Sequence, residues 1–268
     1  MSRIATRFVA RKEEARKVLI PYITAGDPEP GITVNLMHAM VDAGADIIEL
    51  GIPFSDPMAE GPVIQKAMER ALVHHVSLDD VLGMVKQFRQ QDNDTPIVLM
   101  GYLNPVEVKG YQAFAEQASA AGIDGILTVD IPPEEATDYV EAMNENGLDC
   151  IFLVSPTTDE ERIKVVCEAS GGFVYYVSLK GVTGAGHLDI NEVTDRVLAI
   201  RRLTDLPVGV GFGIKDAESA TRIAATSDAV VVGSAIVRKV EENTGSADKI
   251  NKAVSGLLGE IRSALDAM

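Results

Sequence analysis

The run DIIELG, residues 46–51, is a short and mostly apolar segment, and a loop rich in turn-forming residues follows it. Seven further apolar runs have turn residues behind them in the same way: VLIPYITAG, PIVLMGY, GILTVD, CIFLVS, FVYYVS, PVGVGFG and AVVVGS. Nearly continuous hydrophobicity is typical of parallel strands that are covered on both faces. We therefore expect eight buried parallel strands, starting near residues 18, 46, 96, 125, 149, 173, 207 and 229.

The segments between these runs have the periodicity of amphipathic helices, as in residues 78–88, where apolar residues form one helical stripe. Ser77 and Asp216 are expected N-caps, and Thr158 with Glu161 matches a capping box. A strand and a helix alternate about every thirty residues, which is the size of a right-handed βα unit.

Eight such units predict an α/β fold, a (β/α)8 TIM barrel with extra helices that occupies residues 1–268 as a single domain. The second and third strands are separated by the longest gap, which leaves room for a loop over residues 53–61 and about two helices. A second loop, residues 180–187, is rich in glycine, and we expect both loops to be mobile. An open doubly wound sheet is the alternative, but no dinucleotide-binding glycine fingerprint follows the first strand.

The charge of the chain limits its partners. It has 24 Lys and Arg residues against 40 Asp and Glu residues, which gives a formal net charge of −16. A negative field of this size repels nucleic acid and anionic membrane surfaces. We expect neither as a partner, and we expect any anionic substrate to be held by local groups such as the N–H groups at a helix start.

Residue types that bind metals are scattered. Cys150 and Cys167 are the only cysteines, and neither they nor the four histidines have metal-ligand spacing. The N-terminus has no apolar signal region, and no stretch reaches the ~18 apolar residues of a membrane span. We expect a cytoplasmic protein without a metal site.

Glu49 lies inside the second expected strand, where both faces should be apolar. An isolated ionised carboxylate is costly there, so Glu49 should have a raised pKa or a partner. The following loop carries Asp56 and Glu60, and it should lie over the C-terminal ends of the strands, where barrel active sites are found. Glu49 and Glu60 are therefore predicted to be a catalytic pair of carboxyl groups, and a structural ion pair at Glu49 is the alternative.

The last two strand ends have features of a phosphate site, which barrels often place there. Gly211 and Gly213 end the seventh expected strand, and Gly233 and Ser234 lie between the eighth strand and a helix. Bare N–H groups and a hydroxyl can approach an anion closely at such positions, and Gly184 in the second loop adds another. Ordinary capping and close backbone packing are the alternatives.

Large side chains at or near the strand ends would suit a flat aromatic ligand. These residues are Tyr22, Met100, Tyr102, Tyr175 and Phe212. Packing at the rim of the core explains them equally well. No serine nucleophile elbow or nucleotide-binding P-loop is present, which disfavours serine hydrolysis and nucleotide chemistry.

Several longer segments resemble the tryptophan synthase α subunit family along nearly the whole chain, chiefly through ELGIPFSDP: PYITAGDP, AGADIIELGIPFSDPMAEGPVIQ, GYLNP, VSLKGVTGA, GFGI and GSAIV, in this order. The resemblance implies a lyase of tryptophan biosynthesis that cleaves indole-3-glycerol phosphate to indole and glyceraldehyde 3-phosphate by a retro-aldol reaction. It further implies an α2β2 heterotetramer in which indole passes to a pyridoxal-phosphate β subunit, while the α chain needs no cofactor.

The resemblance also implies roles for the two carboxyl groups. Glu49 would protonate C3 of the indole ring and take the proton of the C3′ hydroxyl, and the second carboxylate would hold the positive charge that develops at the indole N–H. That second residue is usually aspartate in an ADGP context, whereas this chain reads AEGP with Glu60. The extra methylene moves the carboxylate by roughly 1.5 Å unless the loop adjusts, and a shift near 1 Å can cost about 100-fold in rate.

Other family positions match residues chosen above. The phosphate contacts match Gly184, Gly213, Gly233 and Ser234, the lid threonine matches Thr183, and the pocket residues match Tyr22, Met100, Tyr102, Tyr175 and Phe212. The resemblance places the loop with Asp56 and the segment around Asn104 and Pro105 in the contact with the β subunit. Two alternatives stay open: another phosphate-binding barrel isomerase or synthase, and a barrel that mainly activates the β subunit.

Overall fold

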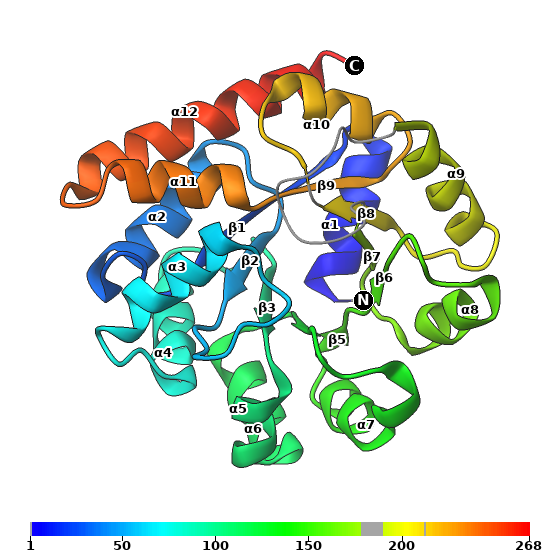
Figure 1. Cartoon of the computed structure of the whole chain (residues 1–268), viewed down its shortest axis with the longest axis horizontal. Helices are drawn as coiled ribbons and strands as arrows, with labels where there is room; N and C mark the ends of the chain where they lie inside the picture. The colour runs from blue at the N-terminus through cyan, green and yellow to red at the C-terminus, as the bar shows by residue number, and fades with distance from the viewer. Residues whose placement is uncertain (1, 178–189, 212) are drawn as a thin grey trace.

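Parallel strands form the centre of the molecule, and helices surround them (Figure 1). The computed structural model describes residues 2–177, 190–211 and 213–268. The nine strands within these ranges are β1 (Val18–Thr24), β2 (Ile48–Gly51), β3 (Ile97–Gly101), β4 (Gly125–Thr128), β5 (Asp149–Cys150), β6 (Leu153–Val154), β7 (Val174–Val177), β8 (Val208–Gly211) and β9 (Ala229–Val232). They pair in the order β5-β4-β3-β2-β1-β9-β8-β7-β6.

The two edges of this sheet belong to one short segment of chain. β5 pairs with β4, and β6 pairs with β7. Between them, the Ile151 N–H donates to the carbonyl of Ile126 at 2.9 Å, and the Tyr175 N–H donates to the carbonyl of Phe152 at 3.2 Å. The hydrogen-bonded ladder thus passes from β4 to β7 through residues 149–154, and the sheet closes into a barrel.

The predicted barrel is therefore confirmed, with one correction. The fifth expected strand, CIFLVS, is divided into β5 and β6 because its first half bonds to one neighbour and its second half to the other. The other seven expected runs each form one strand.

Helices cover the outside of the barrel (Figure 1). Within the described residues these are α1 (Arg3–Glu13), α2 (Pro30–Asp42), α3 (Pro62–Leu72), α4 (Leu78–Phe88), α5 (Leu103–Lys109), α6 (Tyr111–Ala121), the 3₁₀ turn η1 (Pro133–Glu135), α7 (Thr137–Glu145), α8 (Glu160–Ala169), α9 (Ile190–Arg201), α10 (Ala217–Ala224), α11 (Ser234–Glu242) and α12 (Ala247–Asp266). The long gap after β2 holds α3 and α4, as predicted. None of the helices in these ranges has the length and apolar character needed to cross a lipid bilayer.

The helix starts agree with the sequence at two of three predicted caps. Ser77 and Asp216 cap α4 and α10. The capping box predicted at Thr158 and Glu161 is wrong, because Asp159 is the N-cap of α8. Its carboxylate accepts a 2.8 Å hydrogen bond from an amide in the first turn. A charged acceptor at this position is stronger than a hydroxyl, so the helix begins one residue later.

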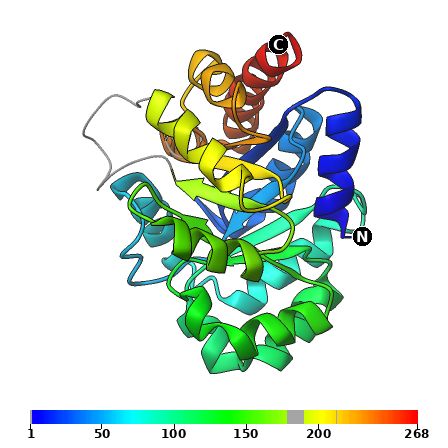
Figure 2. The same cartoon turned by 90° about the vertical axis from the view of Figure 1, so that its right-hand side faces the viewer.

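α1 lies across the end of the barrel where the strands begin (Figure 2). Its Ile4 and Phe8 pack in the barrel interior with Val18 and Phe173. This end of the barrel is filled with apolar side chains, which leaves the opposite end, where the strands finish, for a site.

Aspartates just before the strands fasten the same end. Asp46, Asp124 and Asp228 each accept a hydrogen bond of 2.8–2.9 Å from a backbone N–H of a neighbouring strand. Asp46 also pairs with Arg11 at 2.5 Å and with Arg262 at 3.1 Å. The buried carboxylates of Asp46 and Asp124 are both paired with arginines, as the burial of a charge requires.

Candidate active site

Glu49 points into the barrel from β2. It lies opposite Tyr22 of β1 and Val98 of β3 in the strand register. Ile47 packs in the barrel interior, and side chains two apart on a strand share a face, so Glu49 occupies the same interior face. Its side chain is 2% exposed, and within the described residues its Oε1 has no hydrogen-bond partner.

The two carboxyl groups differ in their proton affinity. Burial raises the pKa of Glu49 to about 8, and the charge of Glu60 contributes to the same direction. Burial also raises the pKa of Glu60 to about 7. Because a charge on one group disfavours a charge on the other, the favoured state near neutral pH has one carboxylate and one neutral acid, and the more deeply buried Glu49 holds its proton more readily.

The loop between β2 and α3 places Glu60 over the strand ends. The Ala59 N–H donates to the hydroxyl of Tyr102 at 2.9 Å, and the side-chain amide of Gln65 donates to the carbonyl of Glu60 at 2.8 Å. Phe54 stacks on Tyr102 with the ring centroids 5.0 Å apart. The loop is thus held from both sides, by the end of β3 and by the first turn of α3.

A cavity of about 290 Å³ opens where these elements meet. Its lining combines both carboxyl groups with the glycine-rich ends of the last strands: Tyr22, Glu49, Glu60, Pro62, Val63, Ile64, Met100, Tyr175, Gly213, Ile214, Lys215, Val231, Gly233, Ser234, Ala235 and Arg238. One pocket therefore contains an acidic pair, an apolar and aromatic wall, and a helix start.

Some predicted site residues lie elsewhere. Tyr102 stands behind the loop that carries Glu60 rather than in the lining. Gly211 adjoins the cavity wall, since a Cβ at this position would overlap the hydroxyl of Tyr175. The predictions for Thr183, Gly184 and Phe212 concern positions outside the described residues.

The start of α11 forms one wall of the cavity. Gly233 is its N-cap and Ser234 its first residue, and no side chain caps the helix there. Its first N–H groups are therefore open to an anion, which the helix dipole also favours. Gly213 has φ 77°, a left-handed conformation that favours glycine.

Two basic residues in the lining, Lys215 and Arg238, were not predicted from the sequence. The prediction considered only glycines and a serine as phosphate ligands. The spacing from Ser234 to Arg238 could have predicted that Arg238 lies beside the phosphate site, because residues four apart share a helix face. Lys215 follows Gly213 by two positions.

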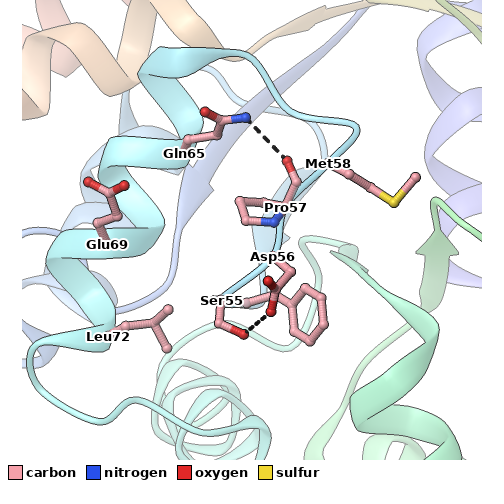
Figure 3. Close-up of a pocket in the computed structure, with 8 residues that line it drawn as sticks. Ser55, Asp56, Pro57, Met58, Gln65, Glu69 and Leu72 are labelled. Carbon is pink, nitrogen blue, oxygen red and sulfur yellow. Dashed lines mark hydrogen bonds between the residues drawn. The ribbon is translucent and has the colours of Figure 1, made fainter.

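A second hollow lies beside the active-site loop (Figure 3). It has a volume of about 390 Å³ and is lined by Phe54, Ser55, Asp56, Pro57, Met58, Gln65, Glu69 and Leu72. Asp56 thus belongs to this hollow and not to the cavity with Glu49. Asn104 and Pro105 lie in α5, close behind Tyr102, which is the N-cap of that helix.

The described part of the chain holds no group of three or more His, Cys, Asp or Glu side chains arranged to bind a metal ion. Cys150 and Cys167 are free and buried. The fold and the cavity define a class of protein: a (β/α)8 barrel with two buried carboxyl groups in a cavity at the C-terminal ends of its strands.

Comparison with known proteins narrows this class. The family model "Tryptophan synthase alpha chain" matches residues 8–265. The tryptophan synthase α chain of Thioalkalivibrio sulfidiphilus is 62% identical over 266 residues, which cover 99% of this chain and 100% of that protein. The α chain of Nitrosococcus oceani is 58% identical over 267 residues, covering 100% of this chain and 98% of its own length.

Solved structures agree. The tryptophan synthase α subunit of Legionella pneumophila has a TM-score of 0.93 at 47% identity, with all of both chains covered. An aminoacrylate-bound tryptophan synthase from M. tuberculosis has a TM-score of 0.88 at 35% identity, covering 99% of this chain and 100% of that one. The chain belongs to the tryptophan synthase α chain family.

The family assignment confirms the predicted function. The chain is a lyase of tryptophan biosynthesis that cleaves indole-3-glycerol phosphate to indole and glyceraldehyde 3-phosphate. The α chain family carries out this reaction without a cofactor.

Proposed function

We propose that Glu49 is the general acid and base of this cleavage, and that Glu60 stabilises the positive charge that develops on the indole ring. The observation that carries the proposal is the placement of two carboxyl groups with unequal pKa in one buried cavity. Glu60 is 6% exposed, so water screens its charge only weakly.

The reaction then needs two proton transfers, and the carboxyl group of Glu49 takes part in both. Neutral Glu49 donates its proton to C3 of the indole ring, and the resulting positive charge spreads to the ring nitrogen. The Glu60 carboxylate accepts a hydrogen bond from that N–H. Glu49, now ionised, takes the proton of the C3′ hydroxyl, the C3–C3′ bond breaks, and its electrons return to the ring, which releases indole and the aldehyde with Glu49 protonated again.

The other lining residues orient the substrate. Tyr22, Met100 and Tyr175 form the wall for the indole ring. Burial raises the pKa of both tyrosines well above the usual value, so their hydroxyls stay neutral beside the carboxyl groups. The N–H groups near Gly233 and the hydroxyl of Ser234 receive the phosphate. Contacts from Gly213, and from Thr183, Gly184, Gly211 and Phe212, complete the proposed site.

We further propose that a β subunit docks on the face around the second hollow, as in an α2β2 heterotetramer, and receives the indole. Met58 beside Asp56 is 86% exposed, and Val108 of α5 is 83% exposed. The stack of Phe54 on Tyr102 joins this loop to the start of α5. Exposed apolar side chains on adjacent elements are typical of an interaction surface.

We place the protein in the cytoplasm. Its two cysteines are unpaired and buried, which suits a reducing compartment.

The first experiment measures indole release from indole-3-glycerol phosphate by the wild type and by Glu49→Gln, alone and with a β subunit. We expect Glu49→Gln to bind substrate but to lose at least about 1000-fold in kcat, since both proton transfers depend on it.

A matched variant controls for charge alone. Glu141→Gln removes an exposed carboxylate of α7 and should keep full activity. Substantial turnover by Glu49→Gln would overturn its acid and base role.

A further inference from the structure

Two cations stand at the phosphate end of the active-site cavity. Lys215 and Arg238 line the same cavity as Gly213, Gly233 and Ser234. Because Ser234 and Arg238 are four residues apart in α11, their side chains leave the same face of the helix. Both side chains are exposed and lie at the edge of the cavity rather than in its depth.

Neither cation is neutralised within the described part of the chain. No hydrogen bond or ion pair of either side chain occurs among those residues. By contrast, Lys239, the next residue of α11, pairs with Glu242 at 3.0 Å. Lys215 helps to lower the pKa of Asp216, but that carboxylate is hydrogen-bonded to Ser219 as the N-cap of α10.

The position of Lys215 is electrostatically unfavourable. It directly precedes Asp216, the N-cap of α10, where the helix dipole favours negative charge, while Arg238 lies one turn into α11 on the face of Ser234. An anion bound between them and the first turn of α11 would remove this disadvantage. The need is large in this chain, because its net charge is −16 and the carboxylate of Glu60 lies in the same cavity and repels an incoming phosphate.

We infer that Lys215 and Arg238 form a cationic rim that captures the phosphate group of the substrate and makes the cavity prefer phosphorylated over unphosphorylated indoles. The inference rests on the phosphate site proposed above. The N–H groups of α11 fix the orientation of the phosphate, and the rim supplies the charge attraction. Since the phosphate keeps its charge throughout the reaction, the rim acts equally on the ground state and the transition state.

The test compares Lys215→Gln, Arg238→Gln and the double variant with wild type, all as the full chain with a β subunit present. Each single change should raise KM for indole-3-glycerol phosphate about fivefold and the double change about 20-fold, with kcat unchanged within about twofold. Arg238→Lys retains the positive charge, so its KM should stay close to the wild-type value. Lys239→Gln is the matched control, because it removes the same charge from the same helix outside the cavity, and its KM should stay at the wild-type value.

Two further measurements separate capture from a structural effect. Inhibition by inorganic phosphate should weaken in the double variant, whereas binding of indole, which carries no phosphate, should be unchanged. Raising the salt concentration should increase the wild-type KM but change that of the double variant much less, because the screened charges are gone. The proposed role of the rim is overturned by an unchanged KM in the rim variants. It is also overturned by an equal rise of KM in Lys239→Gln, or by a loss that affects only kcat.

The outcome is independent of the catalytic roles. If Glu49→Gln were active while the rim variants still weakened phosphate inhibition, the acid and base proposal would fail and the rim would stand. If phosphate inhibition were the same in every variant while Glu49→Gln was inactive, the rim alone would fail.

Discussion

Replacing Glu49 by glutamine should make the protein more stable at neutral and alkaline pH, although it removes activity. The buried carboxyl group has its pKa raised from 4.5 to about 8 in the folded chain. The folded state therefore holds this proton more tightly than the unfolded state. The group costs nothing below pH 4.5, and the stability it removes grows as the pH rises and levels off above pH 8.

The size of the stability change follows from the difference between the two pKa values of Glu49. With a pKa of 4.5 in the unfolded chain and about 8 in the folded chain, ionisation of Glu49 lowers the free energy of unfolding by about 3 kcal/mol at pH 7. At pH 5 the loss is less than about 1 kcal/mol. Glutamine has nearly the same shape and does not titrate. The stability of Glu49→Gln relative to wild type should therefore rise by about 3 kcal/mol between pH 5 and pH 8.

Urea unfolding followed by far-UV circular dichroism at several pH values measures this difference. The relative stability is compared across pH, so a constant effect of the amide on packing cancels. Glu141→Gln, an exposed change on α7, should give a difference that does not vary with pH. Parallel stability curves for wild type and Glu49→Gln would refute the reasoning that burial raises the pKa of this group.

Two further predictions concern the rest of the cavity. Glu60→Ala should lower kcat about 100-fold, whereas Glu60→Asp should keep much of the activity. Glu60→Gln should remove the acid limb, near pH 7, from the pH profile of kcat, because the titrating carboxyl group is gone. Unchanged turnover in Glu60→Ala would contradict the proposed role. Gly51→Ala places a Cβ onto the hydroxyl of Tyr22 and should raise KM about tenfold by displacing the cavity wall, whereas Gly83→Ala, whose Cβ meets open space on α4, should have wild-type kinetics.

The barrel could be predicted because its strands are encoded locally, as apolar runs with turn residues behind them. The division of the fifth run into β5 and β6 could not, since the residue pattern shows that a strand is buried but not which neighbour each half bonds to. The helix start at Asp159 was missed for a similar reason. Thr158 and Asp159 are both good caps, but the carboxylate of Asp159 is the stronger acceptor, and the Thr158 hydroxyl accepts from the Ser155 N–H instead.

For the site, the sequence identified the unusual carboxylate but not its direction. Both faces of β2 are covered, so the alternation of residues alone does not tell whether Glu49 points into the barrel or toward the helices. The structure answers this through Ile47, which packs in the interior on the same face. Lys215 and Arg238 could not be predicted because a basic residue in a loop or on a helix is usually only solvent-exposed, and only the fold shows that these two border the cavity.

The two ends of the barrel differ in whether their buried carboxyl groups have a cation as partner. Asp46, three residues before Glu49 in the same run, accepts a backbone hydrogen bond and pairs with Arg11 and Arg262. Glu49 has no cation beside it among the described residues, and its environment raises its pKa instead. A cation introduced next to Glu49 would relieve the cost of burial, but it would also lower that pKa and remove the neutral acid that the reaction needs. The acid role proposed for Glu49 therefore requires that the group stays unpaired, whereas Asp46 at the other end of the barrel is paired on both of its oxygens.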